Sequence, residues 1–350
     1  MEPNATPAKI LQQLHEALAA GVVLPPSSVR LVLISLLSRG HLLLEDVPGV
    51  GKTTLAKRLA ALVTVPFKRV QGTPDLTPAD LIGSSHYDSK TDSLRFLPGP
   101  IFTSFLLLDE LNRASLRTQA ALLEAMGENT VTHERKTRPL AETFWVIATQ
   151  NPVEFIGTYP LAEAQLDRFF MRIHLGYPSP GEEVKILLLA QGRLEAPMPV
   201  LNEESLIKLQ ALVSRIKVDN KILEYVARLA QATREHSRLR LGVSPRASID
   251  LVKACQAMAL VCGQSFVTPA MVVELIKPIW GHRLVLRQAG ERFESVLDDI
   301  TQKTAAPAMP KEPGNEKPGE APKEAGRRGV KGSLNTKDSL NIQADDPDGH

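Results

Sequence analysis

The sequence predicts an α/β fold in which helices cover a parallel sheet, followed by a small helical domain and a disordered tail. In the first half, short apolar runs alternate with segments of helical spacing, and strands that are apolar throughout are typical of parallel sheets buried between helices. After about residue 178 only helical spacing remains, and near residue 300 the composition shifts to Pro, Gly and charged residues. We therefore expect an α/β domain at residues 1–178, a helical domain at 179–292 and a disordered segment at 293–350.

The segments of the first half alternate between strand and helix. Apolar runs predict strands at residues 42–44, 67–71, 105–108 and 144–149. Between them, apolar residues at helical spacing predict helices at residues 54–63 and 116–126. This half ends at a proline pair, because Pro178 disfavours helical backbone at Tyr177. Ser179 and Glu182 then form a capping box with a proline at the first helical position, which predicts a new helix from Pro180.

In the second half, the apolar spacing predicts helices at residues 180–191, 203–216, 221–236, 247–262 and 269–276. Within the fourth of these, residues at intervals of three and four predict a buried face made of Ile249, Val252, Cys255, Ala259 and Cys262. Gly263 follows as a C-terminal cap. The two cysteines would lie about 10 Å apart on such a helix. That separation is too large for a disulfide, and the low cysteine count fits a reducing compartment.

Charge and hydropathy exclude several classes of protein. The 41 Lys and Arg residues nearly balance the 39 Asp and Glu residues, leaving a net charge of +2. Non-specific nucleic-acid binding requires clustered cations that neutralise phosphates, so we do not expect a nucleic-acid partner. The best apolar run, Leu31–Leu37, falls well short of the ~20 residues that span a bilayer, and the first residues do not follow the pattern of a signal peptide. We expect a cytoplasmic protein without membrane insertion.

A glycine-rich loop between a predicted strand and a predicted helix carries the clearest chemical signal: Pro48-Gly49-Val50-Gly51-Lys52-Thr53-Thr54. Backbone N–H groups in such a loop surround phosphate oxygens, and the following helix adds the positive end of its dipole. Lys52 would reach the β- and γ-phosphates, and Thr53 would ligate Mg²⁺. Asp46 stands where the general pattern has its first glycine, and the plain alternative is a glycine-containing turn. In this context the loop nevertheless predicts nucleotide binding.

Two later strands end in polar residues suited to phosphoryl transfer. Asp109 and Glu110 follow one of them. Because the carboxyl ends of parallel strands line the ligand crevice, Asp109 would hold Mg²⁺ and Glu110 would polarise the attacking water. Asn151, after the other strand, would hydrogen-bond that water or the γ-phosphate, with a simple turn before proline as the alternative. The Asn-Lys pair at residues 220–221 lacks the carboxylate of a guanine-reading motif, so ATP is the expected nucleotide.

Two arginines extend the candidate site. Arg168 lies between an acid and two phenylalanines, which suits a side chain that reaches the nucleotide of a neighbouring subunit, although such an arginine is often only an ion-pair partner. Arg246 stands in the first turn of a predicted helix, where the helix dipole disfavours a cation. A bound phosphate would compensate for that unfavourable position.

These elements, in this order, resemble the AAA+ ATPases and most closely the MoxR family, over roughly residues 22–286. Beyond the glycine-rich loop, the matching stretches are Thr73–Gly83, Gly99–Phe102, Asp109–Ala114, Gln119–Met126, Ala148–Pro152, Gly242–Ser248 and His282–Leu284. The resemblance implies a P-loop NTPase core with a five-stranded parallel sheet and a helical lid. It also implies an insert at Leu81–Phe96 and a hairpin at Thr130–Leu140, both facing a central pore, with plain surface hairpins as the alternative for both segments. One departure lies at Val22–Pro26, where family members commonly have a Gly-Gln pair near the adenine.

The resemblance assigns a role to each candidate residue: Walker A to Lys52 and Thr53, Walker B to Asp109 and Glu110, sensor 1 to Asn151, the arginine finger to Arg168, and sensor 2 to Arg246. The implied ligands are ATP and Mg²⁺. The implied assembly is a homo-hexameric ring with each nucleotide site between two subunits.

The function that follows is an ATPase that remodels or matures a client protein, with a von Willebrand A (VWA) domain protein as a possible partner or metal insertion as a possible task. One alternative is a nucleic-acid-stimulated motor, for which the basic residues Arg135, Lys136 and Arg138 would line the pore. The other is an assembly switch that holds ATP without hydrolysing it, against which the presence of Glu110 argues.

Overall fold

A parallel sheet organises the computed structural model, which describes residues 6–45, 51–151, 158–191, 197–288 and 290–308. Among these residues the sheet has the strand order β2-β5-β8-β1-β9, and every pair is parallel. Its strands are β1 (Leu42–Glu45), β2 (Phe67–Gln71), β5 (Phe105–Asp109), β8 (Trp145–Gln150) and β9 (Met171–Ile173). The predicted parallel sheet is confirmed, and because every pair is parallel, all five carboxyl ends lie along one edge of it.

Alternating side chains of the strands enter two separate hydrophobic cores. Leu42 and Leu44 of β1 belong to one core, whereas Leu43 belongs to the other. The same alternation divides Leu106 from Leu107 in β5. Side chains of a strand point to opposite faces in turn, so both faces of this sheet are covered by apolar groups. That explains why β1 and β5 are apolar at successive positions up to the acid that ends each of them.

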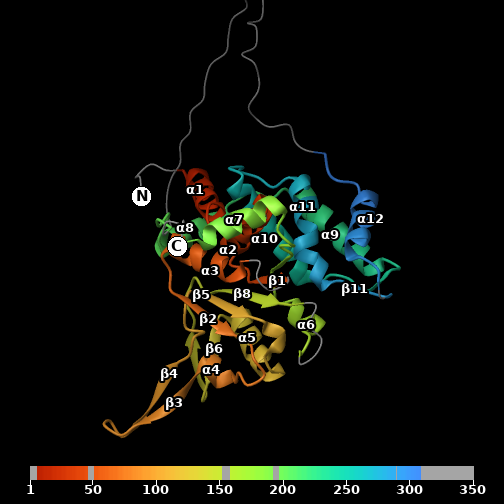
Figure 1. Ribbon diagram of the computed structural model, residues 1–350. Coiled ribbons are helices and arrows are strands. Elements are labelled where there is room, and N and C mark those ends of the chain that lie inside the picture. The colour runs from red at the N-terminus through yellow and green to blue at the C-terminus, as the bar shows by residue number, and fades with distance from the viewer. Residues whose placement is uncertain (1–5, 46–50, 152–157, 192–196, 289, 309–350) are drawn as a thin grey trace, which may run out of the picture. The chain divides into compact units, whose positions relative to one another are not determined.

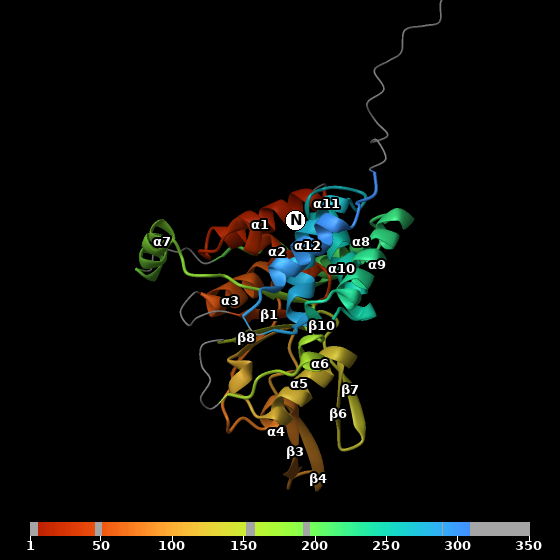
Figure 2. The same ribbon diagram turned by 90° about the vertical axis from the view of Figure 1, so that its right-hand side faces the viewer.

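Helices cover the two faces. On one face lie α1 (Pro7–Ala19), α2 (Pro26–Leu37) and α3 (Lys52–Val63); on the other lie α4 (Pro78–Ile82), the 3₁₀ turn η1 (Leu111–Arg113) and α5 (Leu116–Glu128). The views in Figures 1 and 2 agree on this arrangement. Two antiparallel hairpins lie at the predicted insert and hairpin segments, β3 (Gly83–Asp88) with β4 (Ser93–Pro98), which ends two residues beyond the predicted insert, and β6 (Thr130–His133) with β7 (Lys136–Pro139).

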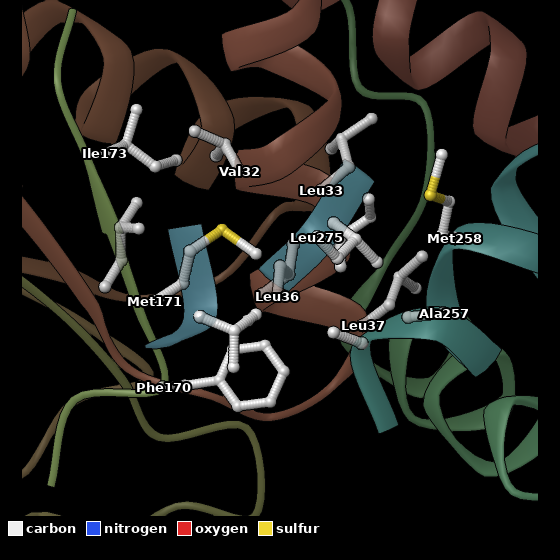
Figure 3. Packing of buried hydrophobic residues seen from close by; sticks show 14 of the residues in the cluster. Val32, Leu33, Leu36, Leu37, Phe170, Met171, Ile173, Ala257, Met258 and Leu275 are labelled. Carbon is white, nitrogen blue, oxygen red and sulfur yellow. The ribbon is translucent and has the colours of Figure 1, made fainter. Parts of the chain in front are cut away.

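The second half of the chain extends the core on the α1–α3 face. After the short helix α6 (Glu163–Leu166) of the first half, its elements are α7 (Pro180–Ala190), α8 (Glu203–Val213), α9 (Asn220–Glu235), β10 (Leu239–Leu241), α10 (Pro245–Val261), α11 (Pro269–Trp280), η2 (Gly281–Arg283), β11 (Val285–Leu286) and α12 (Phe293–Lys303). Figure 3 shows Leu33 of α2 and Leu275 of α11 in one apolar cluster with Met171 of β9. The predicted helices are therefore present, and α8, α10 and α11 pack against elements of the sheet domain.

Three expectations for this half need correction. The segment is not purely helical, because β10 and β11 pair as a short antiparallel ladder. The predicted start of disorder at residue 293 is wrong, because α12 buries Val296, Leu297 and Ile300 against α9 and α11. These residues recur at helical spacing, and the Pro- and Gly-rich composition begins only after them. Residues 309–350 of the predicted tail lie outside the described residues.

The predicted buried face of α10 is also partly wrong. Cys255 and Ala259 are fully buried, but Ile249 is 67% exposed and Cys262 is exposed. The helix contacts α1, α2, α8, α9 and α11, so its small residues are buried around much of the circumference and a single apolar stripe does not describe it. Burial raises the pKa of the Cys255 thiol above its ordinary value, so this thiol stays protonated. None of the described helices is long and apolar enough to cross a membrane.

Candidate active site

The helix α3 begins directly after Gly51, the last glycine of the predicted phosphate-binding loop. Gly51 has φ +86°, a left-handed conformation that glycine adopts without strain. No neighbouring atom would contact a Cβ at this position, so backbone conformation and not space is what requires glycine here. Lys52 and Thr53 then form the first turn of α3, where the helix dipole favours a negative ligand. Three predicted loop residues, Pro48, Gly49 and Val50, lie outside the described residues.

A cavity of about 350 Å³ lies between the start of α3 and the carboxyl ends of β2, β5 and β8. Its lining residues come from all four elements and the turns after them: Gly51, Lys52, Thr53, Thr54, Arg69, Gln71, Asp109, Glu110, Thr149 and Asn151. The structure therefore brings together the described residues that were predicted for the Walker A, Walker B and sensor 1 positions. Their polar groups converge on a space large enough for phosphate groups.

Asp109 is the most contacted acid of this cavity. It is only 7% exposed and ends β5. Its Oδ2 accepts a hydrogen bond from Thr53 Oγ1 at 3.4 Å and one from Arg69 Nε at 2.7 Å. Its Oδ1 accepts a bond from Thr149 Oγ1 at 3.4 Å. A buried carboxylate beside a hydroxyl is a donor set of the oxygen type that Mg²⁺ prefers, so the residues present fit this ion.

Glu110 adopts an unusual backbone conformation for a non-glycine residue, with φ +56°. Its N–H donates to Thr149 Oγ1 at 2.8 Å, and its carboxylate accepts a bond from Arg113 Nη1 at 3.2 Å. Gly72 makes room for this turn, since a Cβ there would lie 2.3 Å from the Glu110 carbonyl oxygen. The strained turn holds the Glu110 carboxylate at the cavity wall next to Asp109.

Asn151 lines the same cavity just beyond β8. It is 7% exposed, and its carbonyl oxygen accepts a hydrogen bond from Asn112 Nδ2 at 3.3 Å. Asn112 belongs to η1, directly after Glu110 and Leu111. The turns that follow β5 and β8 are therefore bonded to each other, which fixes Asn151 relative to Glu110.

Three residues of the cavity were missed by sequence reasoning: Arg69, Gln71 and Thr149. Arg69 and Gln71 are two positions apart on β2, so both point to the same face of the sheet. Their signal is weak, because polar residues on an edge strand are ordinary. Thr149 lies inside a run that is otherwise apolar, and a hydroxyl at the carboxyl end of a buried strand is the signal that would have found it.

The two predicted arginines lie elsewhere. Arg168 is half-buried, and its Nη1 donates to the Leu123 carbonyl oxygen in α5 at 2.5 Å. Arg246 is exposed in the first turn of α10. Burial, with a smaller contribution from the charge of Arg246, lowers the pKa of His41 to about 4. Ser244, two residues before Arg246, donates to Asp167, and the nearby Phe170 N–H donates to the carbonyl oxygen of His41, which immediately precedes β1. The start of α10 therefore lies at the amino ends of the strands, the edge opposite to the cavity.

Comparisons with known proteins agree with this geometry. Residues 41–171 match the family described as "ATPase family associated with various cellular activities (AAA)", and residues 231–303 match an AAA lid domain. The chain is 45% identical over 285 residues to the protein YeaC of Bacillus subtilis, covering 80% of this chain and 89% of that one. It is 40% identical over 282 residues to Chaperone MoxR1 of Mycobacterium tuberculosis, covering 78% and 74% respectively. The crystal structure of a candidate ATPase from Cytophaga hutchinsonii superposes with a TM-score of 0.81 at 32% identity, covering 86% of this chain and 96% of that one.

The fold, the converging polar residues and these matches define an AAA+ ATPase core with its lid. The chain belongs to the MoxR family of these proteins, as the resemblance predicted.

Proposed function

We propose that this chain binds ATP with Mg²⁺ in the cavity between α3 and β5 and hydrolyses it to remodel client proteins. The observation that supports this most directly is the contact between Thr53 and Asp109, 3.4 Å apart although 56 residues separate them in the chain. One comes from the phosphate-binding turn and the other from the end of a separate buried strand. A hydroxyl and a carboxylate paired in this way are the groups that hold Mg²⁺ in P-loop NTPases.

Each side chain of the cavity has a distinct task in this proposal. Lys52, at the positive end of α3, binds the phosphate oxygens. Thr53 and Asp109 hold Mg²⁺, which when bound neutralises charge on the phosphates. Glu110 accepts a proton from the attacking water, and Asn151 orients that water or the γ-phosphate.

Arg168 and Arg246 complete the site of a neighbouring subunit in this proposal. Both lie away from the cavity of their own chain. An arginine supplied by a second subunit is worth about 10³–10⁵ in rate, so hydrolysis would depend on assembly. The assembly we propose is a homo-hexameric ring, as the resemblance to the MoxR family implies. In it, Arg168 is the arginine finger and Arg246 is sensor 2.

The proposed client is a protein, and the β3–β4 hairpin is the proposed contact. Tyr87 and Leu94 are cross-strand partners on this hairpin and are 63% and 69% exposed. Large apolar groups side by side on an exposed hairpin are suited to transient contacts with a polypeptide. The name of the relative MoxR1 also describes a chaperone. A VWA-domain partner, a task in metal insertion and a location in the cytoplasm belong to the proposal on the family resemblance alone.

Affinity capture tests this function. A Glu110→Gln chain with ATP should retain its client, because ATP stays bound while the proton acceptor is missing. Lys52→Ala, which weakens phosphate binding, is the matched control and should release the client. Stimulation of turnover by the captured protein supports the proposal. Stimulation of ATP turnover by DNA alone would instead favour the nucleic-acid motor. Retention of the client by an unmodified chain that shows no ATP turnover would favour the assembly switch.

A further inference from the structure

Arg283 is a buried cation far from the nucleotide cavity. It ends η2 in the His282-Arg283-Leu284 motif, and its side chain is only 2% exposed. Burying a guanidinium requires paired acids and hydrogen-bond acceptors around it. The identity of those acceptors indicates what this residue does.

The acceptors flank Arg168 on both sides. Arg283 Nη2 donates to the carbonyl oxygen of Phe169 at 2.7 Å. Its Nε lies 3.4 Å from Oδ1 of Asp167. The residues directly before and after Arg168 are therefore both held by one guanidinium, and Phe169 itself is fully buried. The backbone that carries Arg168 has little freedom to move apart from Arg283.

The same guanidinium also holds the helix that carries Arg246. Arg283 Nη2 donates to Oδ2 of Asp250, one turn after Arg246 on α10, at 2.6 Å. The hydroxyl of Ser244, two residues before Arg246, donates to both carboxylate oxygens of Asp167 at 3.1 Å. We call Asp167, Ser244, Asp250 and Arg283 the Arg283 cluster. It joins the start of α10 to the segment of Arg168.

We propose that Arg283 is a positioning residue that holds Arg168 and Arg246 as one rigid unit, so that both reach the nucleotide of the neighbouring subunit together. This inference rests on the proposed function, in which those arginines act on a neighbour. It goes further by assigning the coupling between Arg168 and Arg246 to Arg283, a buried cation that lies outside the nucleotide cavity. The lid and the arginine finger then move only together.

The test uses Arg283→Lys, which keeps the charge but replaces a planar group with several donors by a single ammonium. Such an ammonium cannot hold Phe169, Asp167 and Asp250 in the same geometry. We expect turnover of the assembled chain to fall about 100-fold, the loss that a misplacement of about 1 Å causes in a catalytic group. ATP affinity should stay unchanged, because the cavity of the same chain lies at the other edge of the sheet. Arg30→Lys, which alters the exposed Arg30–Glu274 pair, is the matched control and should keep full turnover.

Mixed assemblies distinguish positioning from a purely structural role. In a mixture of Arg283→Lys and Glu110→Gln chains, the first has an intact cavity and the second has intact arginines. We expect the mixture to exceed the turnover of either variant alone. A chain damaged only in its own fold would gain nothing from mixing, and that result would overturn the inference.

A reference mixture separates this inference from the proposed function. Arg168→Ala with Glu110→Gln should recover turnover if the arginine finger acts between subunits. If this pair recovers and the Arg283→Lys pair does not, the inference about Arg283 fails alone. If neither pair recovers, the action between subunits fails and the inference fails with it. Should Arg283→Lys not fold, Asp250→Asn loosens the hold on α10 without removing the cation, and the same outcomes apply.

Discussion

Arg69 Nε donates a 2.7 Å hydrogen bond to Oδ2 of Asp109, the oxygen that also accepts from Thr53. The guanidinium thus contacts the carboxylate that we assign to Mg²⁺. A cation that binds the same oxygen competes with the metal ion. Mg²⁺ binding would therefore require Arg69 to release Asp109.

Replacing Arg69 by Gln should ease Mg²⁺ binding. The Mg²⁺ concentration for half-maximal ATP binding is expected to fall roughly fivefold, since a charge-assisted hydrogen bond is lost at a half-exposed position. A titration of Mg²⁺ against a fluorescent ATP analogue measures this midpoint. Arg113→Gln, at the neighbouring carboxylate of Glu110, is the control and should leave the midpoint in place. A midpoint that rises in Arg69→Gln would show that Arg69 assists the metal instead.

Replacing Glu110 by Gln should leave ATP binding intact and reduce hydrolysis by about 10²–10⁴-fold, the usual contribution of a general base. The amide keeps the shape of the side chain but cannot accept the proton. Phosphate release under saturating ATP, with binding measured separately, checks both parts. Unchanged turnover would reject Glu110 as the proton acceptor.

Gly72→Ala should destabilise the turn after β5. The new Cβ would lie 2.3 Å from the Glu110 carbonyl oxygen and 2.9 Å from that of Asp109, so backbone must shift. We expect a loss of about 1–3 kcal/mol in the free energy of unfolding, together with weaker Mg²⁺-dependent ATP binding. Gly181→Ala has open space around its Cβ and should be neutral or slightly stabilising. Equal effects of the two substitutions in chemical denaturation would contradict this explanation.

The unfolding free energy should fall as the pH drops from about 6.5 towards 4. Burial is the main cause that lowers the pKa of His41 from its ordinary 6.5 to about 4, so the folded chain keeps this imidazole neutral. In that window the unfolded chain binds a proton that the folded chain does not, and folding therefore loses stability with acidification. The contribution is roughly 3 kcal/mol at most. Burial also lowers the pKa of His282 well below its ordinary value, with the same sign.

Denaturant unfolding between pH 7 and 5 checks this prediction. His41→Gln should reduce the pH dependence without abolishing it, because His282 still contributes. His15, a half-buried histidine whose ring lies 3.4 Å from the Pro26 carbonyl oxygen, is the control position for the same substitution. A His41→Gln chain with the full pH dependence would show that another group is responsible.

The strands and the nucleotide turn could be predicted from the sequence because their signals are local. An apolar run such as Leu106–Leu108 is typical of a strand buried on both faces, and Gly51 before Lys52 is typical of a phosphate-binding turn. Apart from the undescribed loop residues, the Walker A, Walker B and sensor 1 residues lie together as expected.

The parts that were missed depend on distant contacts. Arg69 belongs to the site only because β2 pairs with β5, which places Gln71 opposite Asp109. The strand β9 is three residues long with an arginine at its centre, and it is held as a strand by β1 and by the Arg172–Glu45 ion pair. The separation of Arg246 from the cavity follows from how α10 packs, which no local pattern encodes.

The order of strands in the sheet also constrains how this chain can fold. Within the described ranges, the strand before the glycine-rich loop, β1, pairs only with β8 and β9, which begin at Trp145 and Met171. During synthesis β1 therefore lacks its full set of strand partners until both β8 and β9 have left the ribosome. Contacts between such distant segments form slowly, and apolar strands without partners are prone to aggregate. We therefore expect the proposed nucleotide cavity to be completed late in folding, and growing chains that stop before β9 should not bind ATP.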